Sequence, residues 1–121
     1  MAQYLFKTRL EGSTLVVIPT GPIMGLDEGE LGTEVERIYS EIQQRGAVNL
    51  VIDFEHAPYF GSIMLGAMIT LSRRIQIGRG ELALCNVSTA AREVLQITRL
   101  DTRWPIYASQ QEACASIDVH D

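Results

Sequence analysis

The side chains that could do chemistry are concentrated in one segment, DFEHAPYFGS at residues 53–62. The segment begins with Asp53, which ends an apolar run, and finishes with Ser62, which follows Gly61. A carboxylate at a strand end can accept a phosphoryl group or hold the N–H groups of a loop. A serine at a helix start can cap the helix or carry a phosphate. Each possibility predicts a different class of protein.

Asp53 has two interpretations. A phosphoacceptor aspartate, like that of response-regulator receiver domains, needs Mg²⁺ held by an acidic pair after the first strand and a lysine near the last strand. Here Lys7 and Arg9 flank the first predicted strand, and Lys7 is the only lysine in the chain. We therefore favour a structural carboxylate that accepts hydrogen bonds from loop N–H groups.

Ser62 also has two interpretations, and its position alone favours the first. It could be a plain N-cap of the helix that follows. It could instead be a phosphorylation site, because helix N-termini present unpaired N–H groups and a partial positive charge that hold phosphate. A phosphate would bring a charge of about −1.5 to −2, which would repel a partner docked on a neutral apolar surface.

No pattern of nucleophile, base or metal ligand predicts an enzyme. Neither His56 nor His120 accompanies a GxSxG serine, and the GxxxxGK[ST] and GxGxxG phosphate-binding loops are missing from the sequence. Cys85 and Cys114 lack the CxxC spacing of a metal or redox site, and the histidines fit no ligand pattern with them. We expect two buried, reduced thiols, no metal and no cofactor.

The composition excludes two kinds of partner. The 121 residues carry 10 basic and 15 acidic side chains, a net charge of −5, which offers little of the clustered positive charge that nucleic-acid binding requires. The longest apolar run, from Ile63 to Leu71, is far shorter than the roughly 18 residues of a membrane span. The N-terminus has no apolar signal-peptide core. We expect one cytoplasmic domain over residues 1–121.

The hydrophobic pattern predicts alternating strands and helices. Two extended runs around the turn at 11–13 predict an antiparallel hairpin. Thereafter the predicted elements are a helix from an Asp27 cap to Gly46, a strand at 48–54 buried on both faces, a helix at 62–77, a strand at 81–86, a short helix capped by Ser88, a short edge strand at 104–107, and a helix from a Ser109 and Glu112 capping box to Ile117. This order predicts an α/β fold with a mixed, mostly parallel sheet, an N-terminal antiparallel hairpin and about four helices.

The order of these elements and two segments resemble a STAS domain, the fold of bacterial anti-sigma factor antagonists. The segment VNLVIDFEHAPYFGSIMLGAM, at 48–68, is similar to the family's strand, loop and helix start. The segment 75–113 resembles the family's tail, with a strand after a glycine, a capped helix, a Leu-Asp turn, a short strand and a final helix. The resemblance implies a non-catalytic switch in transcription regulation. Unphosphorylated, such a domain binds a partner that is both an anti-sigma factor and a serine kinase, and the phosphorylated form lets go.

The resemblance also implies which residues act. Ser62 falls on the family's phosphorylated serine, Leu65-Gly66 on its Leu-Gly and Asp53 on its strand-end aspartate. The chain departs from the family pattern around the serine. Gly61 replaces the usual Asp, Ile63 and Met64 replace the usual Ser/Thr and Gly, and Met24 stands in a loop that often carries an acidic residue.

We expect a partner-binding surface near Ser62. The predicted members are Met24, Asp53, Gly61, Ser62, Ile63, Gly66 and Ala67. For Ile63 and Ala67 two arrangements remain open: an exposed apolar docking patch, or a face packed on a neighbouring helix. The alternative function is a STAS-like module that binds its partners constitutively, with Ser62 as a cap and no phosphorylation switch.

Overall fold

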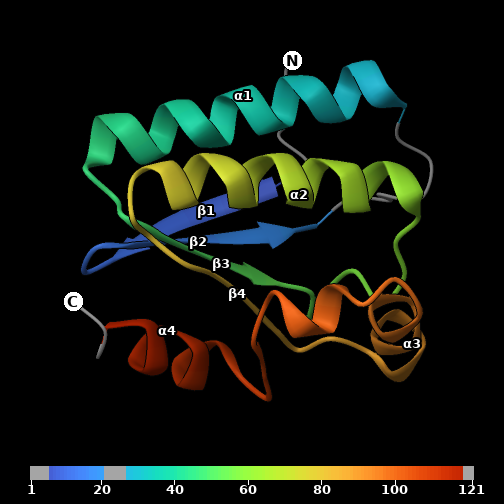
Figure 1. Cartoon of the computed structure of the whole chain (residues 1–121). Coiled ribbons are helices and arrows are strands. Elements are labelled where there is room, and N and C mark those ends of the chain that lie inside the picture. The colour runs from blue at the N-terminus through green and yellow to red at the C-terminus, as the bar shows by residue number, and fades with distance from the viewer. Residues whose placement is uncertain (1–5, 21–26, 119–121) are drawn as a thin grey trace.

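The computed structural model describes residues 6–20 and 27–118. Within these residues the elements follow the predicted order (Figure 1). They are β1 (Phe6–Glu11), β2 (Thr14–Pro19), α1 (Glu28–Arg45), β3 (Asn49–Asp53), α2 (Ser62–Ile77), β4 (Leu82–Cys85), α3 (Thr89–Ile97), a 3-10 turn (Leu100–Thr102), β5 (Ile106–Tyr107) and α4 (Gln110–Asp118).

The strands form a mixed sheet in the order β1-β2-β3-β4-β5. β1 and β2 pair antiparallel, and each later pair is parallel, with Val51 of β3 opposite Ala83 of β4. The sheet therefore confirms the predicted fold class. Short β5 follows Pro105 and lies at a sheet edge, as expected for a strand beside a residue that cannot donate to a ladder.

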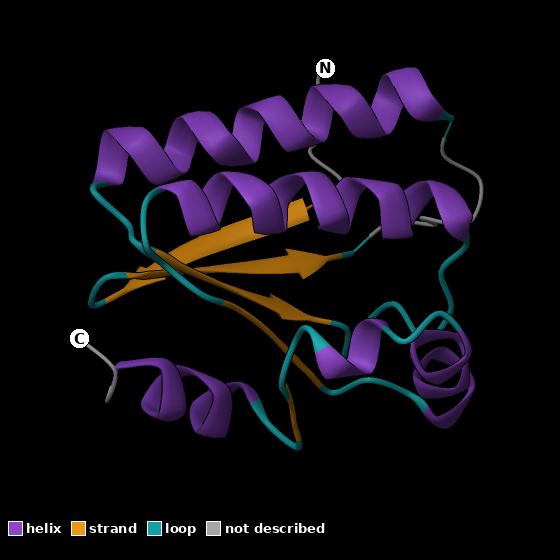
Figure 2. Ribbon diagram, viewed as in Figure 1, coloured by secondary structure: helices purple, strands orange, loops and turns teal. Residues whose placement is uncertain are grey.

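Helices cover both faces of this sheet, as Figure 2 shows. α1 and α2 pack side by side on one face of the sheet, and α4 packs on the other. α3 lies near the N-terminal end of α2, which begins at Ser62. Alternate residues of each strand face opposite ways, so the strands supply two cores. Leu50 and Ile52 join the larger core under α1 and α2, whereas Val51 joins the smaller core under α4. β3 is buried along its whole length, which confirms its prediction as a central strand.

Both cysteines belong to the smaller core. Cys85 and Cys114 are buried and free, as predicted. Burial, together with the Asp53 carboxylate, raises the pKa of the Cys85 thiol to about 12. Cys85 is therefore a protonated packing residue at neutral pH.

The ends of α1 match the sequence signals, whereas the start of α4 needs a correction. A capping box starts α1, where the Glu30 N–H donates to Asp27 Oδ1 at 2.7 Å and the Asp27 N–H donates to Glu30 Oε1 at 3.3 Å. Gly46 ends α1 in a left-handed conformation, with φ of 69°. At α4, the Glu112 N–H donates to Ser109 Oγ at 3.1 Å, but the Glu112 carboxylate accepts from the N–H of Ala108. The predicted capping box is therefore only half formed, because the Glu112 side chain accepts from the backbone N–H of Ala108 and not from that of Ser109.

A membrane-spanning helix is missing from the described part of the chain, where none is long and apolar enough to cross a bilayer.

Candidate partner-binding site

The loop between β3 and α2 brings Ser62 to the molecular surface. Phe54 and Phe60 are buried at its two ends, with ring centroids 5.0 Å apart. Ser88, the cap of α3, donates to the Pro58 carbonyl at 2.5 Å. Between these anchors Tyr59 is 61% exposed. The loop is therefore fixed from beneath while its outer surface stays accessible.

Ser62 is the first residue of α2, and the prediction that it is the N-cap is wrong. The N-cap is Gly61, whose extended backbone has φ of −111° and ψ of −168° and which has no side chain to accept a hydrogen bond. The change of backbone conformation thus comes one residue earlier than the capping interpretation requires. Ser62 is exposed, and its hydroxyl makes no hydrogen bond with any residue that the structure describes.

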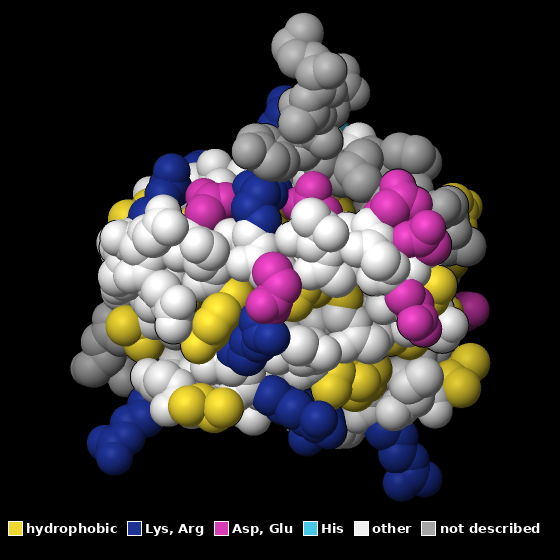
Figure 3. All heavy atoms as spheres, turned by 90° about the horizontal axis from the view of Figure 1, so that it is seen from above, with side chains coloured by type: hydrophobic (Ala, Val, Ile, Leu, Met, Phe, Trp, Pro, Cys, Tyr) yellow, Lys and Arg dark blue, Asp and Glu magenta, His cyan; other side chains and the backbone are white. Residues whose placement is uncertain are grey.

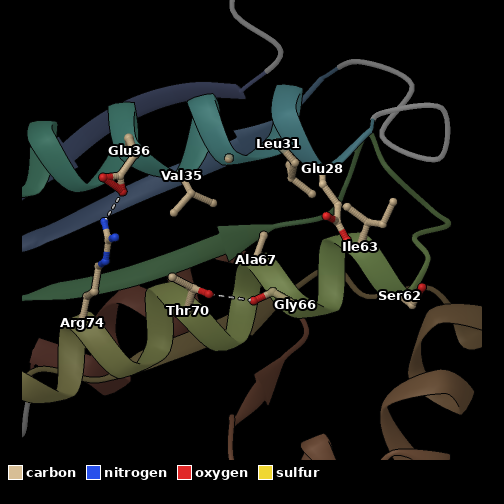
Figure 4. A pocket seen from close by; sticks show the side chains of 11 residues that line it. Glu28, Leu31, Val35, Glu36, Ser62, Ile63, Gly66, Ala67, Thr70 and Arg74 are labelled. Carbon is tan, nitrogen blue, oxygen red and sulfur yellow. Dashed lines mark hydrogen bonds and ion pairs between the residues drawn. The ribbon is translucent and has the colours of Figure 1, made fainter.

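A groove between α1 and α2 begins at Ser62 (Figure 4). It has a volume of about 550 Å³. Its lining comes from α1 through Glu28, Leu31, Gly32, Val35 and Glu36, and from α2 through Ser62, Ile63, Gly66, Ala67, Thr70 and Arg74. Ile63 and Ala67 face α1, yet Ile63 remains 39% exposed. The structure therefore combines the two arrangements left open for these side chains.

Opposite charges close the far end of the groove. Arg74 donates to Glu36 Oε2 at 2.5 Å, and its guanidinium carbon lies 4.6 Å from the centre of the Tyr39 ring. At the Ser62 end, Glu28 lies near Ile63 (Figure 4). Seen from above, acidic side chains follow α1, with hydrophobic side chains between the two helices (Figure 3). The groove is therefore mixed in character, with apolar side chains between the helices, Glu28 on its α1 rim and the Glu36–Arg74 ion pair at its far end.

Asp53 lies beneath this surface. It is 2% exposed, and its Oδ1 accepts from the Glu55 N–H and from Asn86 Nδ2, both at 2.9 Å. Its Oδ2 accepts from Gln110 Nε2 at 2.8 Å. This is the structural carboxylate that we favoured. Both oxygens are already used, and the described residues contain no cluster of metal ligands beside it.

The predicted site residues are only partly brought together. Ser62, Ile63, Gly66 and Ala67 line one groove and Gly61 precedes it, whereas Asp53 is buried below. Met24 lies outside the described residues. Sequence reasoning missed the α1 half of the groove. Its available signal was Gly32, a glycine within the predicted helix beside the apolar Leu31.

This sheet, with its N-terminal hairpin and its helices on both faces, is the fold of a known domain family. The STAS domain family model matches residues 7–113, and the chain belongs to that family. A comparison with curated protein sequences gave no match.

Solved structures show the same fold. A STAS domain protein of Planctomyces limnophilus is 28% identical with a TM-score of 0.77, and the alignment covers 93% of this chain and 97% of that chain. Unphosphorylated SpoIIAA of Bacillus, an anti-sigma factor antagonist, is 21% identical with a TM-score of 0.78, over 93% and 96% of the two chains. An anti-sigma factor antagonist from Mycobacterium paratuberculosis is 18% identical with a TM-score of 0.76, over 93% and 92%.

Proposed function

We propose that this chain is an anti-sigma factor antagonist that acts by protein binding and is switched by phosphorylation of Ser62. Its partner is a protein that is both an anti-sigma factor and a serine kinase. Family membership and the fold support this proposal, and similar structures include SpoIIAA in phosphorylated and unphosphorylated forms.

The observation that carries the proposal is the position of the Ser62 hydroxyl. It is exposed, it is not used to cap α2, and it lies at the mouth of the groove. A serine whose hydroxyl makes a structural hydrogen bond would lose that bond when it is phosphorylated. Here the fold does not depend on the hydroxyl, so a phosphate can be added without unfolding the helix.

The modification is a simple transfer. Ser62 Oγ attacks the γ-phosphorus of the kinase-bound ATP, loses its proton to a base of the kinase, and ADP leaves with the electrons of the broken P–O bond. The resulting phosphate would stand at the N-terminus of α2, where backbone N–H groups lack a side-chain cap and the helix dipole favours negative charge. The product is therefore compatible with the fold.

The same phosphate makes the surface unsuitable for an apolar partner. A hydrated dianion would stand beside Ile63 at the start of α2, where the Ser62 hydroxyl points away from Glu28 (Figure 4). Covering it would cost several kcal/mol of lost hydration, unless the partner supplied matching cations. Phosphorylation therefore weakens any complex in which the partner covers the groove mouth.

The second candidate is constitutive binding without a switch. It is favoured by one feature, since the first turn of α2 has no acidic residue and its N-cap is Gly61. A kinase that reads carboxylates directly beside the target serine would find none there.

Phosphorylation and binding assays with paired variants test the two candidates. Cell extract with ATP should add one phosphate to the wild-type chain, detected by intact mass and located by peptide mapping, and Ser62→Ala should abolish it. Ser116→Ala, at a half-buried serine of α4, is the matched control and should keep it. In quantitative capture, Ser62→Asp should retain less partner than wild type. Unmodified Ser62 with equal binding by wild type and Ser62→Asp would establish the constitutive module instead.

A further inference from the structure

Two glycines in the floor of the groove have no structural reason to be glycines. Gly32 lies inside α1 and Gly66 inside α2, where glycine is less favourable than alanine. A Cβ added at either position would meet nothing within 4 Å, and neither backbone requires a positive φ. Gly80 is the contrast, because its Cβ would lie 1.8 Å from the Val48 carbonyl oxygen. The missing side chains at Gly32 and Gly66 therefore leave open space that only an occupant from outside the chain would use.

The shape of the groove suits one face of an α-helix. The α2 side runs from Ser62 to Arg74, which at 1.5 Å per residue spans about 18 Å, or roughly three helical turns. Ile63 and Ala67 supply its accessible apolar side chains, above the buried Leu31 and Val35 of α1. The groove is open along its length, whereas small-molecule sites bury about 70–90% of their ligand. An amphipathic helix can instead bury one stripe there and leave its other faces in water.

The charges of the rim indicate the flank of that helix. Glu28 and Glu36 lie two turns apart on α1, on either side of Gly32. Arg74 is the one basic residue of the lining, and it is already paired with Glu36. Of the two rim carboxylates, Glu28 has no ion pair with a described residue, so the occupant needs a basic side chain at the Glu28 end of the side that faces α1.

We propose that the groove between α1 and α2 binds an amphipathic helix of about three turns from a partner protein, with its apolar stripe on Gly32 and Gly66 and a Lys or Arg side chain toward Glu28. This inference rests on the proposed function, because Ser62 lines the same groove. A phosphate on Ser62 acts on such a helix as a bulky side chain on the floor would: it lifts the helix from its apolar contacts.

Selection from a library of displayed helical peptides about 14 residues long tests the inference without a known partner. The full chain is the target, and an unrelated protein is used for counter-selection, so that the groove variants remain independent tests. Enriched peptides should carry apolar residues at i, i+3 or i+4 and i+7 with a basic flank. Measured by fluorescence anisotropy, they should bind Gly32→Leu and Gly66→Leu at least about tenfold more weakly than wild type. The matched control Gly29→Leu, at an exposed α1 position outside the groove lining, should bind like wild type.

Every result other than the expected one overturns the helix proposal. Circular dichroism and thermal melts of the leucine variants establish that they are folded, so lost binding reports the groove. No enrichment, enrichment of acidic peptides, or equal binding to Gly66→Leu contradicts the assigned chemistry. Self-association in sedimentation equilibrium that Gly66→Leu abolishes would assign the groove to a second copy. Binding of a dansylated fatty acid that Gly66→Leu abolishes, with no peptide enriched, would assign it to a lipid.

Failure of this inference is distinguishable from failure of the switch. If Ser62 is phosphorylated and the partner is then released, but Gly66→Leu holds the partner as tightly as wild type, the groove assignment fails and the proposed function stands. If peptides select the groove and Ser62 is never phosphorylated, the groove assignment stands and the switch fails.

Discussion

Gln110 Nε2 donates a hydrogen bond to Asp53 Oδ2 at 2.8 Å, which joins the first residue of α4 to the last residue of β3. The side-chain oxygen Oε1 of Gln110 in turn accepts a hydrogen bond from Nε of Arg9, on the outer strand β1, at 2.9 Å. The other oxygen of Asp53 accepts from Glu55 in the loop that leads to Ser62. A single buried carboxylate thus holds α4, the sheet and the base of the candidate site together.

Removing this carboxylate should destabilise the whole domain. Asp53→Ala leaves the half-buried donors of Asn86 and Gln110 without their acceptor and removes a buried carboxylate, so we expect a loss of about 3 kcal/mol in the free energy of unfolding. Urea denaturation measures it. Asp101→Ala, at an exposed aspartate of the 3-10 turn, should change stability by less than about 0.5 kcal/mol. Equal effects of the two substitutions would show that Asp53 has no structural role.

Most of the fold could be predicted because its local signals agree with its tertiary structure. The capping residues Asp27 and Ser88, the glycine at Gly46 and the apolar run of β3 all indicated the elements that the structure shows. The sheet order followed because consecutive strands joined by helices pair in parallel.

The site was harder to predict because it depends on two helices that are distant in sequence. Ser62, Ile63, Gly66 and Ala67 come from one segment, and its periodicity predicted their helix. No sequence pattern states that Gly32 and Glu28 lie across from them, since that depends on how α1 packs on α2. The cap was missed by one residue because serine is the better capping residue by type, while the backbone turn falls at Gly61.

Two glycine-to-alanine substitutions should have opposite effects on stability. Gly80→Ala places a Cβ 1.8 Å from a backbone oxygen of Val48, which cannot be relieved by a side-chain rotation, so we expect a loss of more than about 3 kcal/mol. Gly66→Ala fills open space and lowers the entropy of the unfolded chain, so we expect a gain of about 0.5–1 kcal/mol. Thermal and urea denaturation measure both, and destabilisation by Gly66→Ala would show that the floor of the groove is packed.

The hydrogen bond between Trp104 and Ser72 should contribute to the attachment of the last strand. Trp104 Nε1 donates to Ser72 Oγ at 2.9 Å in a buried position. Ser72→Ala leaves the indole N–H buried without an acceptor, at an expected cost of about 1–2 kcal/mol. The emission of Trp104, the single tryptophan, follows unfolding in urea. Ser40→Ala, which removes a surface hydrogen bond to Gln44 within α1, should cost less than about 0.5 kcal/mol and serves as the control.

Cys85 should make the domain less stable at alkaline pH. Burial and the nearby Asp53 carboxylate raise the pKa of this thiol from an ordinary 9.0 to about 12 in the folded chain. Above pH 9 the unfolded chain releases the proton that the folded chain keeps, so the stabilising contribution is complete below pH 9 and is lost as the pH rises toward 12. The expected loss approaches about 1.4 kcal/mol per pH unit in that window.

The comparison of wild type with Cys85→Ala isolates this effect, because tyrosine and lysine titrations are common to both chains. Urea denaturation between pH 7 and pH 10.5 should show a difference in unfolding free energy that is constant up to pH 9 and then shrinks. Cys85 should also react with Ellman's reagent much more slowly in the folded chain than in urea, because the thiolate is the reactive form. A difference that stays constant across the whole pH range would mean that the folded chain releases the thiol proton as readily as the unfolded chain does.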